Sequence, residues 1–203
     1  PKKAVIALIA GFLGAIGSAG ILLLQALLKK GIESPEKLEE QGVSVYASIP
    51  LSEKQVKANR ATELKHRRSR RLKGAPVQIP LLAQDDPTDL AIEALRSLRT
   101  SLHFAMMDAD NKILMITGPS PSVGKSFVSA NLGAVLAQTG QKVLVIDADM
   151  RKGHLHRYFQ SENKTGLSAY LSCQSVKEDI IQSSSIDNLD FIARGKAPPN
   201  PSE

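Results

Sequence analysis

The sequence predicts an α/β protein: a partial parallel P-loop sheet with flanking helices, preceded by one transmembrane helix. Residues 4–28 contain no charged side chain. Residues 112–139 have the pattern of a strand, a glycine-containing loop and a helix, and residues 142–149 that of a strand ending in two aspartates. The predicted organisation is a transmembrane helix with its flanks (1–30), a juxtamembrane segment with a basic linker (31–84) and the truncated N-terminal part of a P-loop domain (85–203).

Composition bounds the class of protein. The chain has 203 residues, begins with Pro1 rather than Met and ends in a proline-rich stretch, so we expect an internal piece of a longer protein. Its formal net charge is +6, and nine Lys or Arg lie between residues 54 and 73 against one acid, Glu63. Cys173 is the only cysteine, which excludes a disulfide framework or a cysteine metal site and suits a reducing cytosol.

The uncharged run at residues 4–28 predicts a membrane-spanning helix. At 1.5 Å per residue, its 25 residues give a helix of about 37 Å, enough to cross a hydrocarbon core of about 30 Å. The alternatives are a signal peptide, for which the run is too long, and a buried core helix, which rarely stays apolar on every face. Two lysines flank each end of the run, so these charges alone do not set the orientation of the helix.

The juxtamembrane segment contains two predicted elements and one charged run. Ser34, Pro35 and Glu36 are typical of a helix start, Gly42 of its end, and residues 43–49 alternate like a half-buried strand. Residues 51–84 show no sustained apolar period, so we expect a linker. Its basic centre, residues 66–71, favours anionic lipid head groups. No aromatics are interleaved for nucleic-acid stacking, and a solvated linker remains an equal alternative.

The next predicted helix runs from Asp85 to about Met107. Glu93, Arg96 and Arg99 recur within it at intervals of three residues and therefore share one arc of the helix. Taken alone, this pattern indicates an exposed face with local ion pairs.

The run that follows has the order of a phosphate-binding loop: a buried-type strand at residues 112–117, a loop that ends in Gly-Lys-Ser, and a helix over residues 127–139. Loop amides and the helix N-terminus would surround phosphate oxygens, Lys125 would reach the β- and γ-phosphates of ATP, and the Ser126 hydroxyl would ligate Mg²⁺. Pro119 stands where the common pattern has glycine, which stiffens the start of the loop. The predicted nucleotide-binding residues are Gly118, Pro119, Ser120, Pro121, Ser122, Val123, Gly124, Lys125 and Ser126.

A second predicted strand, residues 142–146, ends at Asp147 and Asp149. A strand, helix and strand with a short return form a parallel unit, whose ligands bind at the carboxyl ends of the strands. Two carboxylates there can hold Mg²⁺, and one can accept a proton from an attacking hydroxyl. His154 and His156 follow without further metal ligands nearby, so we expect surface residues. Short helices at 166–171 and 176–182 and a strand at 189–193 complete the prediction.

These motifs together resemble the bacterial tyrosine autokinases (BY-kinases) of the Wzc/Etk type, in the polysaccharide co-polymerase family. The resemblance covers essentially the whole chain, from the second transmembrane helix of that family to a point before its Walker B motif. Three motifs are specific in combination: the P-loop, the Asp147-x-Asp149-x-Arg151 strand end (Walker A′), and Glu93-x-x-Arg96-x-x-Arg99.

The resemblance implies transfer of the γ-phosphoryl group of ATP to tyrosines of a neighbouring subunit, in the control of exopolysaccharide and capsule biosynthesis and export. It implies that Lys125, Asp147 and Asp149 are catalytic, that ATP and Mg²⁺ are bound, and that Glu93, Arg96 and Arg99 form the contact of a ring-shaped homo-oligomer. Implied partners are membrane lipid, the polysaccharide polymerisation and export machinery and a cognate tyrosine phosphatase, without nucleic acid. The implied location is the bacterial inner membrane, with the P-loop domain in the cytoplasm.

Departures from the family limit this expectation. The Walker B aspartate and the tyrosine cluster would lie after residue 203, and some members carry a tyrosine where this chain has His154. We therefore expect the fragment alone to be inactive as an autokinase. Two alternatives are a membrane-linked ATPase switch of the ParA or MinD type and a non-catalytic chain-length regulator.

Overall fold

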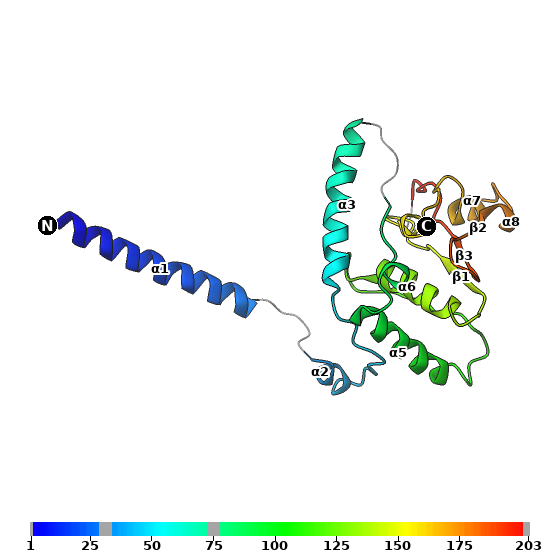
Figure 1. The fold of residues 1–203 in the computed structure, drawn as a ribbon, viewed down its shortest axis with the longest axis horizontal. Helices are drawn as coiled ribbons and strands as arrows, with labels where there is room; N and C mark the ends of the chain where they lie inside the picture. Colours follow the sequence, from blue (N-terminus) through cyan, green and yellow to red (C-terminus); the bar gives the residue numbers. More distant parts are fainter. Residues whose placement is uncertain (1, 29–33, 73–77, 201–203) are drawn as a thin grey trace. The chain divides into compact units, whose positions relative to one another are not determined.

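The computed structural model describes residues 2–28, 34–72 and 78–200 of the chain (Figure 1). The chain divides into two compact units, residues 1–45 and 46–203. Each unit is described by itself. The boundary predicted between residues 30 and 31 lies outside the described residues.

The described residues of the first unit form two helices. Helix α1 (Lys2–Leu28) confirms the predicted apolar helix, and its candidate membrane span, Lys3–Leu24, is exposed wherever the structure describes the side chains. By length and composition α1 can cross a membrane, a test that a signal sequence near an N-terminus also passes. Helix α2 (Glu36–Glu39) has Pro35 at its N-cap position, and Gly42 follows it with a left-handed φ of 80°.

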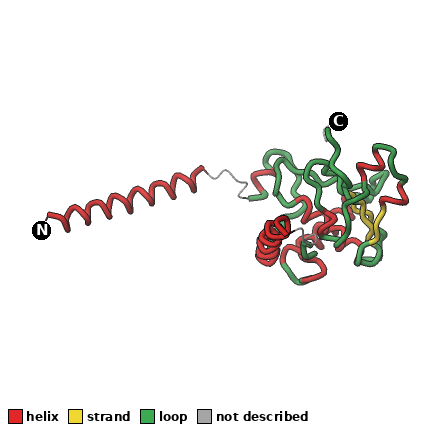
Figure 2. Tube along the Cα trace, turned by 90° about the horizontal axis from the view of Figure 1, so that it is seen from above, coloured by secondary structure: helices red, strands yellow, loops and turns green. Residues whose placement is uncertain are grey.

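The second unit contains a three-stranded sheet of mixed direction (Figure 2). Its order is β1 (Val143–Ile146), β3 (Leu189–Ile192), β2 (Ile181–Ser183). β1 pairs with β3 in parallel, Val143 opposite Leu189, and β2 pairs with β3 in antiparallel fashion. The strands predicted at 142–146 and 189–193 are therefore confirmed. The second half of the helix predicted at 176–182 is wrong: α8 (Lys177–Ile180) is a single turn, after which the chain becomes β2 because β3 offers it a hydrogen-bonding edge.

Helix α6 (Lys125–Ala137) covers one face of this sheet and packs against α5 (Leu90–Ala105). Glycine at position 133 is needed for the close approach, since a Cβ there would lie 2.7 Å from Val145 Cγ2. Asn131, fully buried on α6, accepts a hydrogen bond from Ala83 N (2.8 Å), which fixes the short helix α4 (Leu82–Asp85) against α6. Phe191 of β3 is fully buried and stacks on Phe159, with ring centroids 4.9 Å apart.

The helix predicted from Asp85 to Met107 is α5, and its predicted start is wrong. α4 ends at Asp85, and α5 begins after Asp89, whose carboxylate accepts the Ala91 amide (2.8 Å) as an N-cap. Asp89 is therefore the true helix start. Pro87 lies between the two helices, and its ring disfavours helical geometry at the residue before it.

Residues 51–84, predicted as a linker, contain the helix α3 (Glu53–Leu72). The prediction relied on the absence of an apolar period, and helix formation here depends instead on residues with good helix propensity such as Lys, Arg, Ala and Glu. The first half of α3 is fixed to the unit by polar contacts, including an ion pair between Lys54 and Asp86.

Two predicted strands do not form. Residues 43–49 are assigned no strand, although Val45, Ala47 and Ile49 are half-buried in alternation as expected. Residues 112–117 also form no strand. Within the described chain no backbone-to-backbone hydrogen bond reaches them, and Ile113 and Met115 are 81% and 82% exposed. A strand requires a neighbouring strand, and the described chain places none beside this segment.

The remaining elements are short. The 3-10 turn η1 (Leu155–Arg157) and helix α7 (Leu167–Leu171) lie in the connection from β1 to β2. α7 agrees with the helix predicted at 166–171. Tight backbone packing fixes its start, since a Cβ on Gly166 would lie 2.1 Å from the Ala193 carbonyl oxygen. This contact joins α7 to the end of β3.

Candidate nucleotide-binding site

The glycine-containing loop leads directly into a helix, as the motif requires. Gly124 occupies the N-cap position of α6 with a φ of 98°, a conformation that glycine adopts without steric cost. The helix then begins at Lys125, and Val128 N donates to the Gly124 carbonyl (2.9 Å). The first amides of α6, which have no partners within the helix, are therefore presented at the end of the loop. This arrangement favours an anion because the N-terminal end of the helix dipole adds a partial positive charge.

The loop is compact, and its lysine folds back over it. Lys125 Nζ donates to the Ser120 carbonyl (2.9 Å), and a Cβ on Gly118 would lie 2.8 Å from Val123 Cγ2 and 3.4 Å from the Lys125 side chain. Position 118 therefore allows the loop to close on Lys125. The only partner of this ammonium among the described residues is a neutral carbonyl, which a phosphate oxygen can replace with a stronger, charge-assisted hydrogen bond.

The other residues predicted to bind nucleotide form the rest of the loop and the first turn of α6. Residues 119–123 are exposed, and Ser122 has a left-handed φ of 63°. Ser126 is half-buried in the first turn of α6. Pro119 has no N–H, so the donors of this loop come from the residues that follow it.

The two aspartates after β1 have different surroundings. Asp147 is 3% exposed, and its own amide donates to Ile192 O of β3 (2.9 Å). Its carboxylate accepts the amide of Leu155 at Oδ2 (2.9 Å) and that of Asp149 at Oδ1 (3.3 Å). Burial raises the pKa of Asp147, and the backbone hydrogen bonds oppose this increase.

Asp149 is exposed and caps the turn that follows. Its Oδ1 accepts the amides of Arg151 (3.1 Å) and Lys152 (2.8 Å). Its second carboxylate oxygen has no hydrogen-bond partner among the described residues. Asp147 therefore organises the turn from inside, whereas Asp149 presents a carboxylate to solvent.

Two residues of this turn were not singled out by sequence reasoning. A Cβ on Gly153 would lie 2.6 and 2.7 Å from the two carboxylate oxygens of Asp147, so only glycine allows the turn to close on this side chain. Arg194, just after β3, donates through Nη1 to the Arg151 carbonyl (3.3 Å). Its signal in the sequence was its position at the carboxyl end of a strand parallel to β1.

The prediction that His154 and His156 are surface residues is wrong for His156. Both are half-buried, and the Nδ1 atom of His156 is buried with no hydrogen-bond partner in the described chain. Burial lowers the pKa of His156 to about 4, and the positive charges of Arg157, His154 and Arg194 act in the same direction. The error arose because the local sequence around His156 does not record its burial by other parts of the fold.

The predicted site has two halves, a loop and a turn, and each is held by its own contacts. Within the described residues, no hydrogen bond or ion pair joins the loop of residues 118–126 to the turn of residues 147–155. No group of three or more His, Cys, Asp or Glu that could hold a metal ion occurs in that part of the chain either. Mg²⁺ bound with a nucleotide needs few protein ligands, because phosphates and water supply the others. A hydroxyl and one or two carboxylates are suitable donors.

The predicted interface residues lie together on α5. Glu93 and Arg96 form an ion pair, and Arg99 Nη1 donates to the Val135 carbonyl of α6 (3.4 Å). The three residues therefore share one side of α5, as predicted, and Arg99 faces α6.

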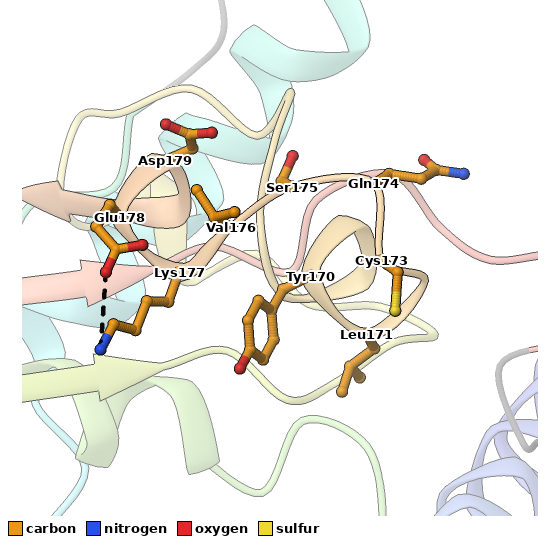
Figure 3. A pocket seen from close by; sticks show the side chains of 9 residues that line it. All are labelled: Tyr170, Leu171, Cys173, Gln174, Ser175, Val176, Lys177, Glu178 and Asp179. Carbon is orange, nitrogen blue, oxygen red and sulfur yellow. Dashed lines mark ion pairs between the residues drawn. The ribbon is translucent and has the colours of Figure 1, made fainter.

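A surface pocket of about 820 Å³ lies elsewhere, between α7 and α8 (Figure 3). It is lined by Tyr170, Leu171 and residues 173–179, including the ion pair of Lys177 with Glu178 (3.7 Å). None of the predicted site residues lines it. Tyr170 is exposed, whereas Tyr158 is buried, which raises its pKa to about 12.

Comparisons with known proteins identify the family that the chain resembles. Residues 114–188 match the family model described as the CobQ/CobB/MinD/ParA nucleotide binding domain. The whole chain is 49% identical to the tyrosine-protein kinase etk of Escherichia coli K12 and 52% identical to the tyrosine-protein kinase wzc of Salmonella typhimurium. The chain spans only 28% and 27% of the lengths of these two relatives.

Solved structures give the same result. The BceF tyrosine kinase domain matches with a TM-score of 0.74 and 44% identity, over 85% of this chain and 66% of that one. The kinase domain of E. coli etk matches with a TM-score of 0.70 and 50% identity, over 85% of this chain and 64% of that one. About a third of each solved domain therefore has no counterpart in these 203 residues.

Proposed function

Since the chain belongs to the Wzc/Etk family of bacterial tyrosine-protein kinases, we propose that it is the ATP-binding part of a membrane-anchored tyrosine autokinase. The observation that supports this most directly is the loop of residues 118–126, which closes on Lys125 and presents the first amides of α6. The proposed reaction transfers the γ-phosphoryl group of ATP to a protein tyrosine. The phosphorus–oxygen bond to ADP breaks, a new bond forms to the phenolic oxygen, and the phenol loses its proton.

In this proposal the loop positions and neutralises the triphosphate. Loop amides after Pro119 and the N-terminus of α6 donate to phosphate oxygens, and Lys125 exchanges the Ser120 carbonyl for the β- and γ-phosphates. The Ser126 hydroxyl is the expected ligand of Mg²⁺, together with Asp147 and Asp149. The metal supplies neutralisation of the charge that develops on the phosphates.

The surroundings of the two aspartates suggest how they share this work. The buried Asp147 already accepts two backbone amides, which makes it the better group for holding the turn and a metal-bound water in place. The exposed Asp149 has a carboxylate oxygen available to accept the phenolic proton. Both act at the carboxyl end of β1, where ligands bind in sheets of this kind.

The wider assembly is part of the proposal. α1 would anchor the protein in the bacterial inner membrane with the P-loop unit in the cytoplasm, and Glu93, Arg96 and Arg99 would contact a neighbouring subunit of a ring. A relative named for the cps region of Klebsiella pneumoniae, 50% identical over the whole chain, supports a role in capsule or exopolysaccharide biosynthesis and export. Expected partners are the polymerisation and export machinery, membrane lipid and a cognate tyrosine phosphatase.

The decisive experiment uses a full-length protein and the substitution Lys125→Met. The expected result is loss of Mg²⁺-dependent ATP binding by calorimetry and loss of phosphotyrosine on immunoblots, because the phosphates lose their cation. Lys112→Met, an exposed lysine before the loop, is the matched control and should retain both signals. Phosphotyrosine that persists at the parental level in Lys125→Met would overturn the catalytic assignment.

The 203-residue chain alone is expected to bind nucleotide weakly and not to phosphorylate itself, since the Walker B aspartate and tyrosine cluster of the family are not in its sequence. Phosphotyrosine on the purified chain after incubation with ATP and Mg²⁺ would contradict this.

An ATPase switch is the second candidate, because the nucleotide-binding family model that matches residues 114–188 also covers MinD and ParA proteins. Steady ATP hydrolysis by the full-length protein without any phosphotyrosine would favour it over the kinase.

A further inference from the structure

Helix α3 has two halves of different chemistry. The first half is fixed to the P-loop unit: Ser52, just before the helix, donates to Asp89 Oδ2 (2.7 Å), Lys54 pairs with Asp86, and the side chains of Gln55 and Thr62 are buried. The second half contains residues 65–71, in which five of seven residues are Lys or Arg and none is acidic. The helix that these contacts attach to the P-loop unit therefore continues into a dense run of basic residues.

The helical register places most of these charged positions on one side of α3. At 100° per residue, positions 67, 68, 70 and 71 fall within an arc of roughly 160°, and position 65 lies roughly 60° outside it. A flat surface of negative charges can therefore meet four of the five positions at once.

We propose that residues 65–71 of α3 bind anionic lipid head groups of the bilayer that α1 spans. The inference rests on the membrane anchoring proposed above but not on kinase activity. The connection between the two helices, residues 29–52, contains 24 residues, which span at most roughly 80 Å when fully extended. Covalent attachment to α1 therefore keeps α3 at a high effective concentration near the head groups.

Charge and composition favour this partner over nucleic acid. Residues 53–72 contain no Phe, Tyr or Trp on which bases could stack. Leu64 and Leu72 are the only large aliphatic residues of this second half, so α3 has little to insert among acyl chains. A basic residue close to an anionic membrane surface strengthens attachment roughly fivefold, so four or five of them suffice for a salt-sensitive attachment.

The test places the 203-residue chain in lipid nanodiscs and measures energy transfer from a dye on α3 to labelled head groups. Cys173→Ser removes the only native cysteine, and Ser69→Cys supplies the labelling position. Discs contain either phosphatidylcholine alone or the same lipid with about a third phosphatidylglycerol. The expected result is strong transfer in anionic discs at low salt, at least fivefold weaker transfer at 0.5 M salt, which screens the surface charges, and weak transfer in neutral discs.

Two variants with the same net charge separate the basic run from general electrostatics. Arg67→Gln, Arg68→Gln, Arg70→Gln and Arg71→Gln together should lose the transfer in anionic discs. Lys112→Gln, Lys142→Gln, Lys164→Gln and Lys177→Gln, which remove four exposed charges elsewhere, should retain it.

Each remaining outcome counts against the proposal. Equal transfer in neutral and anionic discs, or full transfer in the arginine variant, would overturn it. Displacement from anionic discs by a short single-stranded RNA at a concentration far below that of the lipid charge would assign the run to nucleic acid instead. Failure of the chain to enter discs at all would refute the anchoring by α1, which is a different result from entry without transfer.

Discussion

Residues 112–117 and strand β1 are both short apolar runs that lead into one half of the proposed nucleotide site, yet only β1 is a strand. β1 pairs with β3 over four residues, and α6 covers one of its faces. Residues 112–117 receive no backbone-to-backbone hydrogen bond within the described chain. The difference shows that apolar, β-branched sequence is insufficient for a strand when no neighbouring edge is available.

Neither residues 112–117 nor β1 is fully covered by other parts of the described chain. Leu144 and Ile146, on the second face of β1, are about half exposed, and β1 is an outer strand of its sheet. Parallel sheets are usually covered on both faces. The part of the solved kinase domains that this chain lacks offers the simplest source of cover, which leads to the prediction with the largest effect.

Amide exchange should be faster in residues 113–117 than in β1 in this chain. In a complete kinase domain the two segments should exchange at similar rates. In the 203-residue chain, amides of residues 113–117 should exchange near the rate of an unstructured peptide, while those of residues 144–146 that donate to β3 should be protected. In a protein with the complete kinase domain, exchange at residues 113–117 should slow by a factor on the order of 1,000, because a strand pairs with them. Hydrogen–deuterium exchange with mass spectrometry measures the rates in both proteins. Unchanged fast exchange at residues 113–117 in the longer protein would show that no strand pairs with them.

Truncation of the core beneath the sheet should have the next largest effect. Phe191→Ala removes a fully buried ring that stacks on Phe159 and should lower the free energy of unfolding by about 4 kcal/mol. Phe104→Ala, at a phenylalanine of α5 that is 67% exposed, is the matched control and should change it by less than about 0.5 kcal/mol. Equal losses in urea denaturation would mean that β3 is not the centre of this unit.

The turn after β1 should depend on its buried acid and much less on its exposed one. Asp147→Ala leaves the Leu155 amide without its acceptor in a buried turn and should cost about 2 kcal/mol of stability. Asp149→Ala exposes its amide partners to water, which can replace the carboxylate, so a cost below about 0.5 kcal/mol is expected. Both variants should be measured at neutral pH by the same denaturation assay, and the reverse order of losses would contradict the assignment of Asp147 as the organiser of the turn.

The turn after β1 was easier to predict from the sequence than the loop of residues 118–126 and the run before it. Asp147, Asp149 and the strand before them were located because an apolar run ending in acids is a local pattern. Gly153 and Arg194 were missed because their roles depend on contacts that the local pattern does not record: a steric limit against Asp147 and a hydrogen bond across 43 residues. His156 was misjudged for the same reason.

The P-loop was also found from local pattern, and Gly124 and Lys125 begin α6 as expected. The strand before it was predicted but is not formed, since pairing is not a local property. The helix α3 was missed because it lacks an apolar stripe, the feature that most helix prediction relies on.

His156 should make the unit acid-sensitive. Its pKa is lowered to about 4 in the folded protein, against an ordinary value of 6.5, so the unfolded chain binds the proton more tightly. Neutral His156 therefore makes its full contribution to the stability of the folded unit above pH 6.5, and this contribution is lost as the pH falls from 6.5 toward 4. His156→Gln should therefore show a smaller drop in urea midpoint between pH 7 and pH 5 than the parent chain. His103→Gln, an exposed histidine on α5, should leave the drop unchanged, and a drop in His156→Gln as large as the parental one would contradict the cause.

The smallest expected change in stability concerns residues 112–117. Ile113 is 81% exposed, so Ile113→Ser should change the free energy of unfolding of the 203-residue chain by less than about 0.5 kcal/mol. In a complete kinase domain, where a neighbouring strand and its covering helices would bury this side chain, the same substitution should cost about 2 kcal/mol or more. Lys112→Ser, an exposed residue one position earlier, should be neutral in both proteins. If Ile113→Ser is equally harmless in the complete domain, the side chain stays in water there too, and exposure of this run is a property of the folded kinase and not of a missing neighbour.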